Sequence, residues 1–245
     1  VEERTAELQQ ANHVKDKFLS IIAHDIRSPF MGFLHLTEIM TNEKAELDKS
    51  QLIDYSKKLH TSALNQYQLL ENIFQWSQMQ GGSIDFTPRE IGISDLILNN
   101  ILLIHQRAVQ KGITIINEVQ GTHTAYADPR MIDAVLRNLL SNAVKFSNRG
   151  EKVVIKLKET EKEMIEISVI DTGIGIPGDI IKKLFVIGEK VGSKGTEGEL
   201  STGLGLILCK EFVERNGGKI WVESKEKQGS VFSFTIPMNT SSKKI

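Results

Sequence analysis

The histidine at position 24 is followed directly by an acid, Asp25, within the segment FLSIIAHDIRSPF. A neutral imidazole nitrogen is a nucleophile, and a neighbouring carboxylate can orient the ring and accept the proton that its other nitrogen gives up. Pro29 lacks an N–H and is expected to bend a helix just after His24, which would expose the ring. His13 and His35 have neither an adjacent acid nor such a bend, and we interpret them as structural. His24 is therefore the predicted nucleophile and Asp25 its base.

A polar stripe occurs in NLLSNAVKFS, where Asn138, Asn142 and Lys145 are spaced by four and then three residues. On a helix this spacing places the three side chains on one face. An asparagine oxygen there could ligate Mg²⁺, whose other ligands would be phosphate oxygens and water, and Lys145 would face a triphosphate. A polar face in contact with solvent is the alternative interpretation.

Asp171 ends the apolar run MIEISVI and is followed by TGIGIPG. A carboxylate at a strand end can accept a hydrogen bond from an adenine amino group, and Gly173 and Gly175 would let the backbone approach the base. With Gly178 these glycines also spell GxGxxG, the pattern of dinucleotide-binding folds. We reject that interpretation because Pro177 interrupts the turn and no βαβ unit with an acid on its second strand follows.

Gly203 and Gly205, in STGLGLILCKEF, lie where a second glycine-containing motif leads into an amphipathic helix. Free N–H groups and the positive end of the helix dipole would favour phosphate at this point. The intervening stretch FVIGEKVGSKGTEGELS is rich in glycine and has no sustained apolar pattern. Between two phosphate-site motifs, it is predicted to be a mobile lid over ATP.

The nucleophile requires a helical support, and the first eighty residues supply one. Apolar residues recur at three- and four-residue steps toward Met40, a polar break TNEKAELDKS follows, and a second periodic run continues to Trp76. This pattern predicts an all-α antiparallel helical hairpin. Because two helices cannot bury both apolar faces, we expect a homodimeric four-helix bundle.

GGSIDFTPRE marks a boundary near residue 82, so the predicted domains are 1–82 and 83–245. Mixed helix and strand patterns in the second domain predict an α+β two-layer sandwich. The expected helices are 93–111, 129–146 and 204–216, and the expected strands are 113–119, 153–159, 164–170, 219–224 and 230–237.

Composition excludes several other classes. The chain is 40% hydrophobic and carries 30 basic and 31 acidic side chains, a balance that argues against a nucleic-acid partner. Its one cysteine, Cys209, excludes an intrachain disulfide. No apolar run is long enough to span a membrane, so we expect a cytoplasmic fragment without membrane contact. Because the chain begins within a helical pattern, we expect it to be a fragment of a longer protein. That full-length protein could still be anchored in a membrane.

Taken together, these motifs resemble those of sensor histidine kinases of two-component systems. HDIRSP matches every position of that family's H box, His-Asp/Glu-x-Lys/Arg-Ser/Thr-Pro. NLLSNAVKFS resembles the N box, DTGIGI the G1 box and STGLGL the G2 box, with Ser201 where glycine is frequent. Leu184-Phe185 stands where the F box carries an aromatic residue.

The resemblance implies an ATP- and Mg²⁺-dependent kinase that phosphorylates itself on His24, through in-line attack on the γ-phosphorus, and then passes the phosphoryl group to an aspartate of a response-regulator receiver domain. Many relatives also dephosphorylate their regulator, using a residue four positions after the histidine, and Ser28 at that position predicts weak phosphatase activity. Asn142 is the implied metal ligand. The implied nucleotide-binding set is Asn138, Asn142, Lys145, Phe146, Asp171, Gly173, Gly175, Ile176, Phe185, Thr202, Gly203, Leu204 and Gly205.

Two alternative functions compete with this interpretation. A gyrase- or MutL-like nucleotide clamp would explain residues 83–245 but not a helical hairpin that carries HDIRSP. A non-catalytic dimeric ATP-binding scaffold is disfavoured because His24, Asn142 and Asp171 are all present.

Overall fold

The computed structural model describes residues 23, 26–27, 29–42, 47–80, 86–186, 189, 194–199 and 203–239. The chain divides into two compact units, which are considered separately below. The first contains the described residues up to 80, with Glu189, and the second contains the others from 86 onward.

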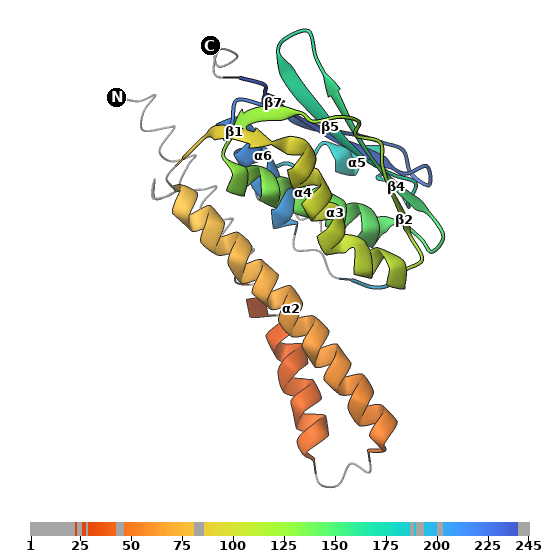
Figure 1. The fold of residues 1–245 in the computed structure, drawn as a ribbon. Helices are drawn as coiled ribbons and strands as arrows, with labels where there is room; N and C mark the ends of the chain where they lie inside the picture. Colours follow the sequence, from red (N-terminus) through yellow and green to blue (C-terminus); the bar gives the residue numbers. More distant parts are fainter. Residues whose placement is uncertain are drawn as a thin grey trace. The chain divides into compact units, whose positions relative to one another are not determined.

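The first unit is helical. Residues 29–41 form one helical segment and α2 (Lys49–Gln80) forms another, and the two lie side by side (Figure 1). Asp48 and Gln51 cap the start of α2 reciprocally: Gln51 N donates to Asp48 Oδ1 at 2.8 Å, and Asp48 N donates to Gln51 Oε1 at 3.0 Å. Gln66 Nε2 of α2 donates to the carbonyl of Ile26 at 3.3 Å. None of the described helices is both long and apolar enough to cross a membrane.

Large apolar side chains remain exposed on both helices of this unit. Those more than half exposed are Phe30, Met31, Leu34, Leu64, Tyr67, Leu70 and Phe74. The predicted four-helix bundle needs a second copy of the chain, so it stays a prediction here.

The second unit is an α+β domain (Figure 1). Its helices are α3 (Ile93–Gln110), α4 (Pro129–Phe146), α5 (Gly178–Ile181) and α6 (Leu204–Arg215). Its strands are β1 (Arg89–Gly92), β2 (Thr114–Asn117), β3 (Thr124–Ala127), β4 (Lys152–Glu159), β5 (Met164–Asp171), β6 (Ile220–Ser224) and β7 (Ser230–Pro237).

Five strands form the main sheet in the order β2-β4-β5-β7-β6. Strands β2 and β4 are parallel, and the other neighbours are antiparallel. Helices α3, α4 and α6 cover one face of the sheet (Figure 1). In the register of this sheet, Asp171 at the end of β5 lies opposite Val153 of β4 and Ser230 of β7.

The core lies between this face and α4. Burial alternates along β5, where Ile165, Ile167 and Val169 are buried with about 1% or less of their surface exposed. The apolar face of α4 is buried as well, including Leu136 and Leu139. Burial of such side chains is worth about 1.5–3 kcal/mol each, which makes α4 a firm support for the polar residues on its other face.

The long elements agree with the sequence prediction to within a few residues, and α4 and β7 agree at both ends. Three short elements were missed: β1 and β3, which pair antiparallel as a separate two-stranded sheet, and α5. Each has only four residues. No period of 2 or 3.6 could be recognised in these three segments.

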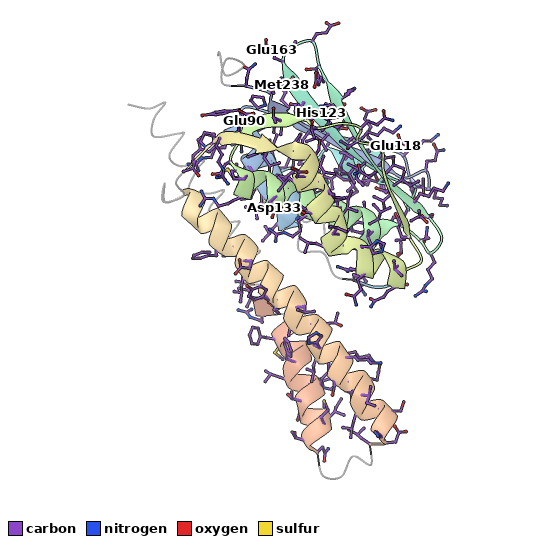
Figure 2. The ribbon with its side chains drawn as sticks, viewed as in Figure 1. Glu90, Glu118, His123, Asp133, Glu163 and Met238 are labelled. Carbon is purple, nitrogen blue, oxygen red and sulfur yellow. The ribbon has the colours of Figure 1, made fainter. Side chains whose placement is uncertain are left out.

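His123 shows how the start of β3 is fixed (Figure 2). Its backbone N–H donates to Ser94 Oγ at 3.0 Å, and its carbonyl accepts from Ile93 N at 2.9 Å. Its ring nitrogens lie 3.1 Å from Glu159 Oε1 and 2.9 Å from the carbonyl oxygen of Gln120. These local partners give His123 a structural role.

Candidate functional site

Helix α4 holds the polar stripe. Its N-cap is Asp128, whose side chain accepts from Arg130 N at 3.0 Å, and proline occupies its first turn, where a missing N–H costs nothing. Along the helix, Asn142 Nδ2 donates to Asn138 Oδ1 at 2.9 Å. The two N-box asparagines are therefore adjacent, as the spacing predicted.

Lys145 does not lie on a face in contact with solvent, since only 7% of its surface is exposed. Burial lowers the pKa of its ammonium group to about 8, and the positive charges of Arg107 and Lys111 act in the same direction. The carboxylate of Glu199 opposes that shift. A buried cation of this kind would gain stability from a phosphate anion, because the anion favours the charged form.

Asp171 is buried at the end of β5. Burial raises the pKa of its carboxyl group to about 6, although hydrogen bonds from Gly173 and Ser230 act in the opposite direction. The backbone N–H of Gly173 donates to Asp171 Oδ1 at 3.0 Å. At neutral pH the group is thus a largely ionised acceptor in a nearly dry environment, which suits a donor such as an adenine amino group.

The turn after β5 is held against the end of α4. A Cβ at Gly173 would overlap the carbonyl oxygen of Phe146, and Ile174 N donates to that same oxygen at 3.1 Å. Only glycine allows this approach. The G1 and N boxes are therefore in direct contact.

Gly175 and Ile176, which come next in the chain, contact residues at and just after the end of β6. Gly175 has φ +65°, and a Cβ on it would overlap the carbonyl oxygen of Lys225. Ile176 N donates to Ser224 Oγ at 2.9 Å at the end of β6.

Helix α6 brings the G2 box against the middle of α4. It begins at Leu204, which is buried, after Gly203 in the left-handed conformation with φ +70°. A Cβ at Gly205 would collide with the side-chain amide of Asn138. The first turn of α6 thus packs directly on the polar face of α4.

Five other predicted residues have no contact with this cluster that can be described. Phe185 is half-buried in the turn after α5, beside buried Leu184. His24, Asp25, Ser28 and Thr202 lie outside the described residues.

Sequence reasoning missed three residues that surround the polar stripe. The Lys111 ammonium and the Thr196 side chain and backbone N–H all donate to the carbonyl of Lys145, and Glu199 pairs with Lys111. No spacing rule marks them, because they are separated from their partners by 34 to 88 residues.

The donor set fits a magnesium ion that arrives with a nucleotide. Asn142 uses its amide nitrogen on Asn138, which leaves its oxygen as the atom for a cation. Within the described part of the chain, no three His, Cys, Asp or Glu side chains gather to hold a metal ion. Mg²⁺ prefers few protein ligands together with phosphate oxygens and water, so one asparagine oxygen is a suitable contribution.

The Gly175 turn yields a stability prediction. Gly175→Ala is expected to lower the free energy of unfolding by about 1–3 kcal/mol, because alanine is strained at positive φ and its Cβ meets the Lys225 carbonyl. Urea unfolding monitored by circular dichroism measures the change. Gly178→Ala is the matched control: a Cβ there meets nothing within 4 Å, so we expect a change within about 0.5 kcal/mol. Equal effects of the two substitutions would contradict the assigned geometry.

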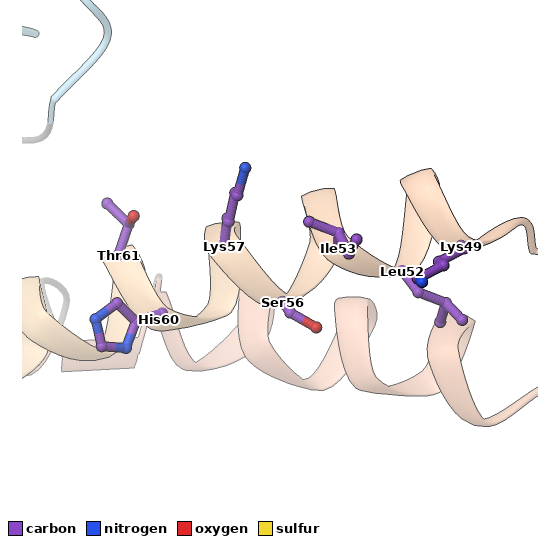
Figure 3. A pocket seen from close by; sticks show the side chains of 7 residues that line it. All are labelled: Lys49, Leu52, Ile53, Ser56, Lys57, His60 and Thr61. Carbon is purple, nitrogen blue, oxygen red and sulfur yellow. The ribbon is translucent and has the colours of Figure 1, made fainter.

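The first unit has a pocket of its own (Figure 3). It runs along α2 and is lined by Lys49, Leu52, Ile53, Ser56, Lys57, His60 and Thr61. It contains none of the predicted nucleotide-binding residues.

Comparison with known proteins shows what this chain is similar to. Residues 127–240 match the family described as histidine kinase-, DNA gyrase B- and HSP90-like ATPases. The sensor protein GacS of Pseudomonas syringae is 30% identical over 237 residues, which cover 95% of this chain and 26% of GacS. The chain spans between 26% and 46% of the length of the first curated relatives that it matches.

Two solved structures extend the comparison. The catalytic domain of histidine kinase ThkA is 28% identical and superposes with a TM-score of 0.56, covering 64% of this chain and 99% of that domain. ThkA in complex with the response regulator TrrA gives a TM-score of 0.69 at 22% identity, covers 97% of this chain and 66% of ThkA, and is similar in fold.

Over residues 127–240 the chain is therefore similar to the histidine kinase-, DNA gyrase B- and HSP90-like ATPases. The chain as a whole is similar to sensor histidine kinases, and the resemblance predicted from its motifs is confirmed.

Proposed function

We propose that this chain is the catalytic core of a sensor histidine kinase, which transfers the γ-phosphoryl group of ATP to His24 and then to a receiver-domain aspartate. The observation that supports it most is the contact of three motifs along the C-terminal half of α4. Gly205 packs on Asn138, and Gly173 packs on the Phe146 carbonyl beside Lys145. On this basis we propose that each motif binds a different part of the nucleotide.

In the proposed binding mode, ionised Asp171 accepts from the adenine amino group. The free N–H groups at the start of α6 bind phosphate oxygens, and the Lys145 ammonium lies beside the triphosphate. Asn142 contributes one oxygen ligand to Mg²⁺, which when bound would offset the negative charge of the phosphates. Hydrogen bonds within the chain hold the backbone carbonyl of Lys145 and the side-chain amide of Asn142, which would reduce the ordering that these two residues need on binding.

The proposed chemical step joins a nucleophile, the His24 ring, to an electrophile, the γ-phosphorus of ATP. A neutral His24 ring nitrogen attacks the γ-phosphorus in line, an N–P bond forms, and the bond from the γ-phosphorus to its bridging oxygen breaks, so that ADP leaves. Asp25 accepts the proton from the other ring nitrogen. The phosphoramidate then gives up its phosphoryl group to a carboxylate of the receiver.

The partner proposal rests on the relatives. A solved complex pairs the similar kinase ThkA with a response regulator. We therefore propose a receiver domain as the acceptor and propose no nucleic-acid partner. Mixing the purified phosphorylated chain with candidate receiver domains and Mg²⁺ tests this step: label should leave the chain and appear on one receiver within minutes. Retention of all label on the chain with every receiver tried would contradict the partner assignment.

Homodimerisation through residues 1–82 gives a further prediction. The first unit exposes large apolar side chains on both helices, including Leu34 with 61% of its surface exposed. Sedimentation of the whole chain is expected to show a dimer, and Leu34→Asp should shift it to monomer by placing a charge in the buried interface. Leu103→Asp on α3, where the leucine is 70% exposed in the second unit, is the matched control and should leave the dimer intact. A monomeric parent chain at high concentration would remove the four-helix bundle from the proposal.

Two further assignments remain part of the proposal. Ser28 would orient water for weak dephosphorylation of the regulator, with a hydroxyl that both donates and accepts hydrogen bonds. The chain would act in the cytoplasm as part of a longer protein. The alternative is a non-catalytic dimeric ATP-binding scaffold, which would bind ATP through the same residues without labelling His24.

A further inference from the structure

Lys111, at the end of α3, is a buried lysine whose ammonium group donates three hydrogen bonds. It is 3% exposed. Its Nζ donates to the carbonyl oxygens of Lys145 at 2.7 Å and Val144 at 3.1 Å, and to Glu199 Oε1 at 3.1 Å. An ammonium group has three N–H donors, so each contact has its own hydrogen.

Two of these contacts lie at the C-terminal turn of α4. The carbonyl groups of the last turn of a helix lack intrahelical partners and carry the negative end of the helix dipole. A buried cation at this position satisfies them and stabilises the turn that contains Lys145. The backbone of Lys145 is thus held from α3, through a residue 34 positions away.

The third contact reaches the segment 194–199, here called the 194–199 turn, which lies within the predicted ATP lid. Glu199 closes this turn upon itself: its Oε2 accepts from Glu197 N at 2.9 Å, and its carbonyl accepts from Gly195 N at 2.7 Å. The other carboxylate oxygen pairs with Lys111. Although burial acts the other way, hydrogen bonds, including that from Lys111, hold the pKa of Glu199 below its ordinary value.

Thr196 adds a second attachment beside the first. Its N–H donates to the carbonyl of Lys145 at 3.2 Å, and its hydroxyl donates to the carbonyl of Ser147 at 2.8 Å. The turn also touches the Lys145 side chain, because a Cβ at Gly195 would lie 2.7 Å from Lys145 Cγ. The backbone and the side-chain stem of Lys145 are therefore both in contact with this turn.

We propose that Lys111 and Glu199 are a pair of positioning residues that fasten the 194–199 turn to the C-terminal turn of α4 and so place Lys145 for the triphosphate. The inference rests on the proposed function for the role of Lys145, but the fastening itself is independent of any nucleotide. Neither residue contacts the nucleotide in this scheme. Both act through Lys145.

The proposal predicts different effects on binding of the phosphates and on binding of adenosine. Loss of the pair releases the turn and displaces the Lys145 ammonium, so binding of the phosphates weakens. Asp171 shares no partner with Lys111 or Glu199, since its hydrogen bonds come from Gly173 and Ser230. Recognition of adenosine, which has no phosphate, should therefore be nearly unchanged.

The fastening is tested by amide hydrogen exchange on the whole chain without nucleotide. Glu199→Gln removes one charge with little change of shape, and Lys111→Met removes the other. Each should speed exchange at Thr196 and Glu197 by about tenfold to a hundredfold, as expected for a lost hydrogen bond to a charged group. The double variant should be no faster than the more affected single one, and Lys111→Arg should restore part of the protection.

Arg149→Met is the matched control. Arg149 also pairs with this turn, at 2.8 Å from Glu197 Oε1, but its side chain is 70% exposed. An exposed pair contributes little, so exchange should change by about fivefold or less. Unchanged exchange in both Glu199→Gln and Lys111→Met, or an equal change in Arg149→Met, would overturn the fastening.

Binding measurements by calorimetry test the consequence. In Glu199→Gln the dissociation constant for ATP should rise about tenfold, and that for adenosine should stay within about twofold. Equal weakening of both ligands would overturn the positioning role and leave a general structural one. If the unaltered chain binds no ATP, the proposed function fails, whereas the exchange result still decides whether the pair fastens the turn.

Discussion

Replacing His24 by glutamine is expected to abolish ATP-dependent phosphorylation of the chain while ATP affinity stays nearly unchanged. Glutamine has no nucleophilic ring nitrogen, so the N–P bond cannot form. The proposed nucleotide-binding residues all lie beyond residue 137, in the other compact unit. Incorporation of γ-labelled phosphate and calorimetric binding of ATP measure the two properties separately.

His35→Gln is the matched control for this experiment. It makes the same change of side chain on the same helical pattern, at a histidine without an adjacent acid. We expect labelling close to that of the parent chain. Ordinary labelling of His24→Gln, together with its loss in His35→Gln, would show that the wrong histidine had been chosen.

Asp171→Asn is expected to raise the dissociation constant for ATP by about tenfold to a hundredfold. A hydrogen bond to a charged group contributes about 1.5–3 kcal/mol, and asparagine presents a neutral amide in a buried position that needs an ionised acceptor. Asp179→Asn, the same change at an exposed acid in the first turn of α5, should leave affinity unchanged. Equal affinities in the two variants would remove Asp171 from the base site.

The pH dependence of adenosine binding checks the same assignment. Because burial raises the pKa of Asp171 to about 6, its carboxyl group becomes protonated as the pH falls through 6. Protonation removes the charged acceptor, so adenosine affinity should decrease below this pH in the parent chain. The Asp171→Asn variant should show a flat profile over the same range.

The sequence predicted the elements and motifs whose signals are local. Helix α4 was predicted with its correct ends, because Pro129 begins it and an apolar stripe marks its buried face. The contact between Gly205 and Asn138 was not predicted, because the N and G2 boxes were identified from a family resemblance and no spacing rule joins them. Strands β1 and β3 were missed because neither four-residue segment carries a readable period.

The attachments of Lys145 could not have been predicted in the same way. Lys111 resembles an ordinary lysine at a helix end, and Glu199 lies in a glycine-rich stretch that indicates a loop. Their partnership spans 88 residues and appears only when α3, α4 and the 194–199 turn are brought together. Burial of Lys145 likewise depends on that turn, so the sequence left a polar face in contact with solvent as an alternative.

The chemical nature of the phosphorylated product tests the central proposal most directly. The chain is incubated with Mg²⁺ and γ-labelled ATP, denatured, and divided between acid and alkali. We predict that label on the protein is lost in acid and retained in alkali, as for a phosphorus–nitrogen bond on histidine. Acid-stable label would contradict the account, as would ATP hydrolysis without any labelled protein, which is the result expected of a nucleotide clamp. Tight ATP binding with neither label nor hydrolysis would establish the non-catalytic scaffold instead.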